Sequence, residues 1–174
     1  MNFEFKRVQC IEDSNIYRVD NFTDIYETDL NSNDDFNIDN LNLIFQQRIH
    51  QFIIHVGKSE VLHFKEEVDS KNIFYKILDF GKNNIFFVFE SIRKKEVLYI
   101  INLFYSVTIE NTLAIICFGE KVHIEFEKIA QNRVIEYVMG KCFVPKITLV
   151  PSSACAFIQY DGALLTIVSN NLEI

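Results

Sequence analysis

The C-terminal part of the chain constrains the fold most, because its pattern predicts two β-strands around a tight turn. Residues 154–160 and 163–169 are mostly apolar, and Asp161-Gly162 separates them. An Asp-Gly pair accepts the positive φ angles of a type I′ turn, which joins antiparallel strands through two residues. Cross-strand packing on one face then predicts three facing pairs: Tyr160–Ala163, Ile158–Leu165 and Ala156–Ile167.

The middle of the chain predicts further strands, because segments rich in Ile, Val, Phe and Tyr alternate with short polar connections. These segments are residues 61–68, 73–80, 85–92, 97–107, 113–118, 121–127 and 142–150. The connections 81–84 and 93–95 are short enough to join antiparallel neighbours. Residues 85–89 and 98–105 are apolar on both sides, which predicts the centre of a sheet. Pro145 predicts an edge strand or a bulge.

Helices are predicted in two places, and a short strand is predicted over residues 3–8. Residues 41–56 carry apolar side chains at three- and four-residue spacing: Leu41, Phe45, Ile49, Phe52 and Val56. This spacing is typical of an amphipathic helix. A second helix is predicted over residues 128–139, ended by Gly140.

Length and composition favour one domain over residues 1–174. A chain of 174 residues with 49% apolar side chains buries roughly 70% of its unfolded surface when it folds. The combined pattern predicts the α+β class, with a largely antiparallel, multi-stranded sheet and about two helices packed on it.

The negative charge of the chain is local. Residues 10–40 carry nine carboxylates and one base, for a net charge of −8, whereas residues 41–174 are neutral and the whole chain is at −7. We expect this acidic segment to be an irregular excursion whose apolar side chains dock on the core. A concentrated field of one sign commonly faces a partner of the opposite sign. The predicted partner-binding residues are Asp24, Glu27, Asp29, Asp34, Asp35 and Asp39. The alternative is a solvated segment that only keeps the protein in solution.

Two stretches resemble metal sites only in part. Residues 29–33 match the first three ligand positions of an EF-hand loop, but Asp34 replaces its turn glycine and Asn40 its closing glutamate. His123, Glu125 and Glu127 share one face of a predicted strand but span ~13 Å, which is too far for one ion. His63 is predicted to lie on a strand without a partner. The sequence therefore predicts neither a metal ion nor another cofactor.

The remaining motifs do not indicate catalysis. The chain contains no G-x-S-x-G, P-loop or dinucleotide fingerprint, so we do not expect an enzyme. The widely spaced Cys10, Cys117, Cys142 and Cys155 are typical of buried free thiols in a reducing compartment, although an even number also permits disulfide pairing.

Membrane and nucleic-acid partners are not expected. The longest apolar run, residues 97–109, is interrupted by Asn102 and Ser106 and is too short to span a bilayer. The first residues lack the features of a signal peptide, so a cytoplasmic location is expected. Net acidity argues against binding to nucleic acid.

In size, acidity and lack of catalytic motifs, the whole chain resembles bacterial immunity proteins of contact-dependent growth inhibition and related polymorphic toxin systems. The resemblance implies a protein that neutralises a cognate toxin, such as a nuclease, by occluding its active site or basic surface. It assigns no role to individual residues.

Two other functions stay open. One is a structural or regulatory module that forms homo-oligomers through exposed strand edges. The other is a small enzyme or a single-strand nucleic-acid-binding fold that uses an aromatic sheet face.

Overall fold

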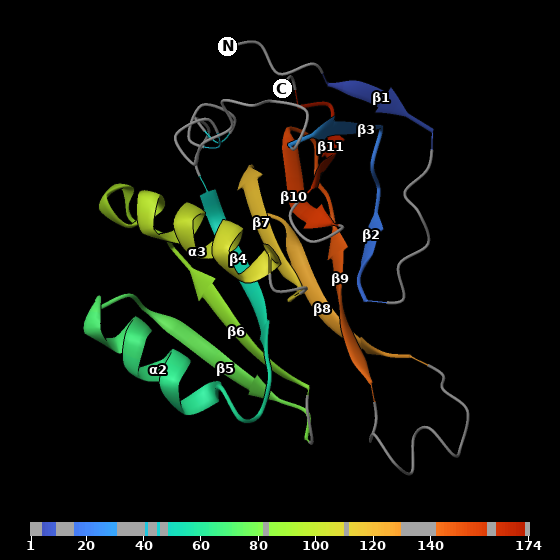
Figure 1. Cartoon of the computed structure of the whole chain (residues 1–174). Coiled ribbons are helices and arrows are strands. Elements are labelled where there is room, and N and C mark those ends of the chain that lie inside the picture. Colours follow the sequence, from blue (N-terminus) through green and yellow to red (C-terminus); the bar gives the residue numbers. More distant parts are fainter. Residues whose placement is uncertain are drawn as a thin grey trace.

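The protein is built in three layers, with two helices and a small sheet on opposite faces of a large sheet (Figure 1). The computed structural model describes residues 5–9, 16–30, 41, 45, 49–81, 84–109, 112–129, 142–159 and 163–172. The helices are α2 (Val61–Ser70) and α3 (Val97–Ile109), and a short 3₁₀ turn, Lys94–Glu96, precedes α3. No helix within these ranges is both long and apolar enough to cross a membrane.

The large sheet has eight strands in the order β1-β3-β11-β10-β7-β4-β6-β5, and all its neighbours are antiparallel. Its strands are β1 (Lys6–Val8), β3 (Asp24–Asp29), β4 (Ile49–Val56), β5 (Tyr75–Asp79), β6 (Ile85–Glu90), β7 (Ala114–Gly119), β10 (Ser153–Gln159) and β11 (Leu164–Asn170). The predicted class, a single α+β domain with a largely antiparallel sheet, is confirmed.

The small sheet has three strands, β2 (Arg18–Asp20), β9 (Phe143–Thr148) and β8 (His123–Lys128). The central strand β9 is parallel to β2 and antiparallel to β8. The prediction that Pro145 marks an edge or a bulge holds only locally, because β9 is the central strand but pairs at Pro145 with β8 and not with β2. Pro145 is tolerated because β2 pairs with β9 only from Lys146 onwards, so the missing N–H faces no β2 partner.

The large sheet separates two apolar cores. Successive side chains of a strand point to opposite faces, so Phe87 and Phe89 of β6 pack on the helix side, while Phe86 and Val88 pack towards the small sheet. Residues 85–89 are thus buried on both faces, as their sequence predicts. Strand β6 is nevertheless second from the sheet edge, because only β5 lies beyond it.

The predicted hairpin at the C-terminus is confirmed in its register. Ala156 faces Ile167 and Ile158 faces Leu165 across β10 and β11. The turn residues 160–162, and with them the predicted Tyr160–Ala163 pair, lie outside the described residues. The predicted strands at 73–80, 85–92, 113–118, 121–127 and 142–150 are also present, as is the short N-terminal strand.

The predicted helix over residues 41–56 is wrong in its second half. Residues Ile49–Val56 form strand β4, which lies between β7 and β6. In the first half, residues 42–44 and 46–48 lie outside the described residues, and the backbone N–H of Phe45 donates to the carbonyl of Leu41 at 2.9 Å. The helical spacing misleads because β4 is buried on both faces. Such a strand lacks the alternation that distinguishes it from a helix.

Two predicted strands, 61–68 and 97–107, are instead the helices α2 and α3. In α2, Phe64 and Val68 are buried four residues apart, the spacing of a helix that covers a sheet with one face. In α3 apolar side chains dominate and only Asn102, Ser106 and Thr108 interrupt them, so periodicity alone could not separate helix from strand. The connection 93–95 therefore leads into a helix and does not close a hairpin, and residues 98–105 are not part of the sheet.

The acidic segment is not an irregular excursion where it is described. Residues 16–30 contain β2 of the small sheet and β3 of the large one, and β3 is an internal strand between β1 and β11. As predicted, apolar side chains dock the segment on the core: Tyr17, Val19, Ile25 and Leu30 are buried. The predicted helix over 128–139 and Gly140 lie outside the described residues, except Lys128, which ends β8, and Ile129.

Candidate functional site

The predicted partner-binding carboxylates of β3 do not share one face. Glu27 and Asp29 lie on the same face of β3 as Ile25, which packs towards the small sheet. Asp24 lies on the opposite face with Tyr26, which packs on the helix side. Asp24 forms an ion pair with Arg7 of β1 and also accepts a hydrogen bond of 2.8 Å from Thr23 Oγ1.

Glu27 lies opposite Lys6 in the register of β1 and β3, whereas Asp29 is exposed at the end of β3. The other three predicted residues, Asp34, Asp35 and Asp39, lie outside the described residues. The same holds for the calcium-like stretch after Asp29, apart from Leu30. Of the three predicted carboxylates that the structure describes, Asp24 binds β1 through Arg7, Glu27 lies opposite Lys6, and Asp29 is exposed.

The acidic segment is attached to the large sheet through an aromatic contact. The ring of Tyr17 packs on Phe157 with centroids 4.2 Å apart, and its hydroxyl accepts a hydrogen bond of 3.1 Å from Gln159 Nε2. Two apolar side chains of the same segment remain in solvent, because Ile16 is 54% and Phe22 42% exposed. The segment therefore presents carboxylates and apolar groups from a fixed backbone.

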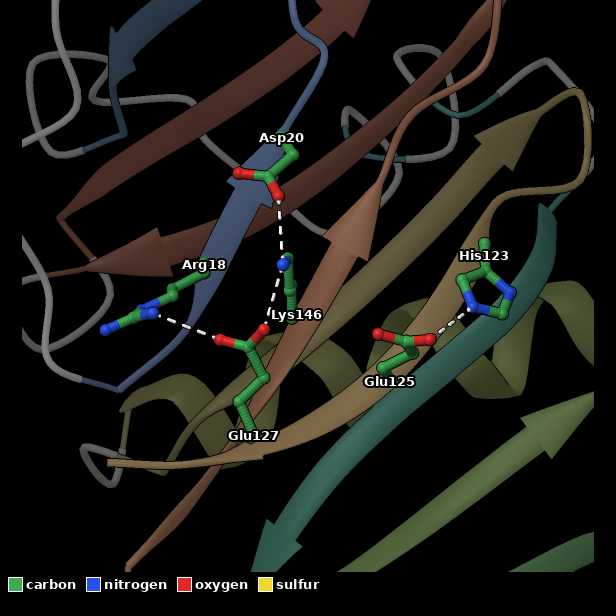
Figure 2. A network of polar contacts seen from close by, with 6 residues as sticks. All are labelled: Arg18, Asp20, His123, Glu125, Glu127 and Lys146. Carbon is green, nitrogen blue, oxygen red and sulfur yellow. Dashed lines mark hydrogen bonds and ion pairs between the residues drawn. The ribbon is translucent and has the colours of Figure 1, made fainter. Parts of the chain in front are cut away.

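A network of charged side chains holds β2 on the small sheet (Figure 2). Lys146 Nζ lies 2.8 Å from Glu127 Oε1 and 3.4 Å from Asp20 Oδ2. Arg18 donates to Glu127 Oε2 at 3.0 Å. The hydrogen bond from Lys146 lowers the pKa of Glu127, and the charges of Lys146 and Arg18 lower it further. The parallel pair of β2 and β9 spans only three residues, and this network adds side-chain contacts to it.

The predicted arrangement of β8 is confirmed. Its charged residues His123, Glu125 and Glu127 point away from Ile124 and Phe126, and His123 Nε2 lies 3.0 Å from Glu125 Oε1. Within the described ranges, no three His, Cys, Asp or Glu side chains gather closely enough to hold a metal ion.

The sequence did not predict a hollow of about 370 Å³ between α2, α3 and the end of β4. Apolar side chains form one part of its wall: Ile54, Val56, Phe64, Leu103 and Val107. Polar side chains form the other part: Glu60, His63, Glu67, Ser106 and Thr112. His55 also lines it, but the ring of His55 lies on the opposite face of β4, 5.1 Å from that of Phe86.

The polar wall of the hollow follows from the helical geometry of α2. His63 follows Glu60 by three residues and Glu67 follows it by seven, which places all three on one face of a helix. Tyr99 of α3 donates to Glu67 Oε1 at 3.1 Å, and its burial and the nearby Glu67 raise the pKa of its hydroxyl. This spacing is visible in the sequence, but it carries meaning only once 61–70 is known to be a helix.

The described cysteines are free thiols. Cys117 of β7 and Cys155 of β10 face each other in register and are fully buried on the small-sheet side. Burial raises the pKa of Cys117 to about 12 and also raises that of Cys155, so both thiols are protonated at neutral pH. Cys142 is half-buried, which departs from the expected full burial, and Cys10 lies outside the described residues.

Comparisons with protein-family models, with curated proteins and with solved structures found no match for this chain.

Proposed function

We propose that this protein is a binding inhibitor for a basic protein, acting in the cytoplasm as an immunity protein that neutralises a cognate toxin. The observation that carries the proposal is the described part of the acidic segment, residues 16–30, which is fixed by β2 and β3 and still presents Ile16, Phe22 and Asp29 to solvent. Opposite charge accelerates encounter with a basic surface, and exposed apolar groups supply contact area once it is reached.

Fixation of the segment favours tight binding. Ordering a loose tail at an interface costs conformational entropy, whereas side chains on a fixed backbone lose less. Tyr17 and Val19 are buried, and Lys146 Nζ of β9 lies 3.4 Å from Asp20 Oδ2, at the end of β2. The charged and apolar groups of residues 16–29 are thus arranged before any partner arrives.

The test begins with the gene immediately upstream of the one that encodes this chain. We expect it to encode a secreted protein with a basic C-terminal domain, and expression of that domain alone to stop growth of a bacterial host. Co-expression of this chain should restore growth, and calorimetry on the purified pair should give a 1:1 complex that weakens as salt rises. An upstream metabolic gene, or a toxic domain that this chain neither binds nor neutralises, would contradict the proposal.

A matched pair of variants tests the role of the acidic segment. The first variant combines Glu27→Gln, Asp29→Asn, Asp34→Asn and Asp35→Asn, and it keeps Asp24 because Asp24 pairs with Arg7. Its affinity should fall by about tenfold to thirtyfold, since exposed charge pairs contribute up to about 1 kcal/mol each. The control variant combines Glu66→Gln with Glu120→Gln, two exposed carboxylates outside the segment, and should bind normally. Equal affinity of both variants would exclude the acidic segment as the binding surface.

Self-association remains the second candidate, because β5 ends the large sheet and pairs only with β6. Ile77 of this strand is 39% exposed, and the preceding Phe74 is 69% exposed. An edge strand with exposed apolar side chains can pair with another chain. Light scattering at high concentration should then give a dimer that Ile77→Lys converts to a monomer, and a monomer at all concentrations would exclude this candidate.

One part of the third candidate, single-strand binding on an aromatic sheet face, gains no support from β4 and β6. The aromatic side chains of β4 and β6 are buried between the layers, so they do not form the open stacking platform that single-strand binding uses.

A further inference from the structure

We propose that the hollow between α2 and α3 is a binding site for a small aliphatic amine. The alkyl chain would occupy the apolar part of the wall, and the ammonium group would bind the Glu67 carboxylate, with Glu60 adding attraction over a longer distance. This inference is independent of the proposed function, because the hollow is formed by α2, α3 and β4 and involves no residue of the acidic segment.

The size and the apolar wall of the hollow suit a small organic ligand. Its volume of about 370 Å³ lies within the range of about 300–1,000 Å³ that small-molecule sites have. Val56, Phe64 and Leu103 are themselves buried, and the ring of Phe64 packs edge-on against Phe87 with centroids 4.7 Å apart. The apolar wall is therefore formed by packed side chains before a ligand enters.

The charge of the wall selects a cation. Glu60 and Glu67 are acidic, and the eleven residues that line the hollow include no lysine or arginine. Lys71 lies outside this lining, with its Nζ 5.8 Å from the centroid of the Tyr99 ring. An anionic ligand would meet two carboxylates, whereas an ammonium group would be attracted by both.

The hydrogen-bonding groups of the wall fit an ammonium donor. Glu67 accepts one hydrogen bond from Tyr99, and a carboxylate has further lone pairs for an ammonium group. The hydroxyls of Ser106 and Thr112, which also line the hollow, can accept as well. Glu60 and Glu67 are two helical turns apart, about 10.5 Å along the axis, which is too far for both to contact one cation. The ammonium group therefore binds Glu67, and the charge of Glu60 acts on it over a longer distance.

The first experiment is calorimetry of the full chain with three ligands of equal chain length: n-hexylamine, 1-hexanol and hexanoate. Hexylamine should bind most tightly and hexanoate should not bind. Among n-alkylamines, affinity should rise by about fourfold per added methylene, the value of one buried CH₂ group, until the hollow is filled. Equal binding of hexylamine and hexanol, or no saturable binding of any amine at millimolar concentration, would overturn the proposal.

The second experiment locates the site with matched variants. The double variant Glu60→Gln with Glu67→Gln should bind hexylamine about tenfold more weakly, while Glu66→Gln, an equal charge change outside the lining of the hollow, should bind it normally. The variant Ser106→Leu adds apolar volume at an exposed position that lines the hollow, and it should abolish the gain in affinity per methylene. Thermal melting checks that each variant is folded. If the double variant and the Glu66 variant bind equally, the amine does not bind in the hollow.

Discussion

The two faces of the large sheet are covered in different ways. The small sheet closes one face, whereas the helices leave a hollow on the other that a ligand can enter. The small sheet covers one face, and the apolar side chains of its strands pack on the large sheet. Its outer surface carries the Lys146 network. The two helices cover the other face through single stripes of side chains, and they leave the hollow between them. Two helical cylinders on a sheet touch it along lines, so space remains between them unless further side chains fill it.

Thiol reactivity tests how completely the small sheet covers its face. Raising the pKa of Cys117 from 9.0 to about 12 lowers its thiolate fraction at pH 8 about a thousandfold. In the folded protein, iodoacetamide should therefore modify the half-buried Cys142 much faster than the fully buried Cys117. Mass spectrometry of tryptic peptides measures both rates, and labelling in urea is the control in which the rates converge. Comparable rates in the folded protein would mean that this face opens readily.

Truncation of one phenylalanine in each core tests whether the two faces unfold together. Phe104 lies on the helix side and Phe157 on the small-sheet side, and both are buried. Changing either to alanine should lower the free energy of unfolding by about 3–5 kcal/mol, because a cavity replaces the ring. Urea denaturation measures this loss.

The two variants should differ in local stability. Phe157→Ala removes the ring on which Tyr17 packs, so trypsin should cleave faster at Arg18 in that variant. Phe104→Ala removes a ring from the other core. Once its loss of overall stability is taken into account, trypsin should cleave this variant at Arg18 no faster than the wild type. Equal acceleration in both variants would show that the acidic segment is released only by unfolding of the whole domain.

A pair of glycines tests the join between β7 and β10. A Cβ on Gly119 would lie 2.4 Å from the carbonyl oxygen of Ser152, and its φ angle is +80°. Gly119→Ala should therefore cost about 2 kcal/mol or more, from the clash and from the left-handed backbone together. Gly81 has a similar φ of +89° but nothing within 4 Å of a Cβ, so Gly81→Ala should cost about 1 kcal/mol. If both variants lose the same stability in thermal unfolding, the clash with Ser152 is not the cause of the loss in Gly119→Ala.

The smallest expected effect concerns the charged network on the small sheet. In Lys146→Met, Glu127 loses the hydrogen bond that does most to lower its pKa. A carboxyl whose pKa is lowered by folding contributes stability above its unfolded value, near 4.5, and that contribution is lost as pH falls through the folded value.

The wild type should therefore be slightly more stable than Lys146→Met at pH 7, and the difference should shrink below pH 4.5. Urea midpoints at pH 7 and at low pH measure it. Lys76→Met is the matched control, because Lys76 also bonds a carboxylate, Glu90, at 2.6 Å, but lies on β5 and not on the small sheet. A pH-independent difference for Lys146→Met would show that packing of its alkyl chain, and not its charge, holds β2.

Sequence reasoning succeeded where the residues of a segment are compatible with only one local structure. The Asp161-Gly162 pair permits a two-residue turn, so the register of Ile158 with Leu165 followed. The alternation in β8 likewise placed His123, Glu125 and Glu127 on the outer side. The reasoning failed for β4, which is buried on both faces, and for α3, which is largely apolar, because the spacing of their apolar residues does not distinguish strand from helix.

The candidate surfaces show the same limit. Residues 10–40 stand out in the sequence by charge alone, but only the structure separates Asp24, which pairs with Arg7, from Glu27 and Asp29 on the other face of β3. The hollow was missed because Glu60, His63 and Glu67 lie on one side of α2, a segment that the sequence pattern assigned to a strand.

By itself, the sequence determined an α+β domain, its antiparallel C-terminal hairpin and the location of its negative charge, because each depends on local chemistry. The tertiary structure alone decided which apolar segments are helices, how the two faces of the sheet are covered, and where the hollow lies. Those properties depend on what packs against each segment, and side chains from distant parts of the chain supply that packing.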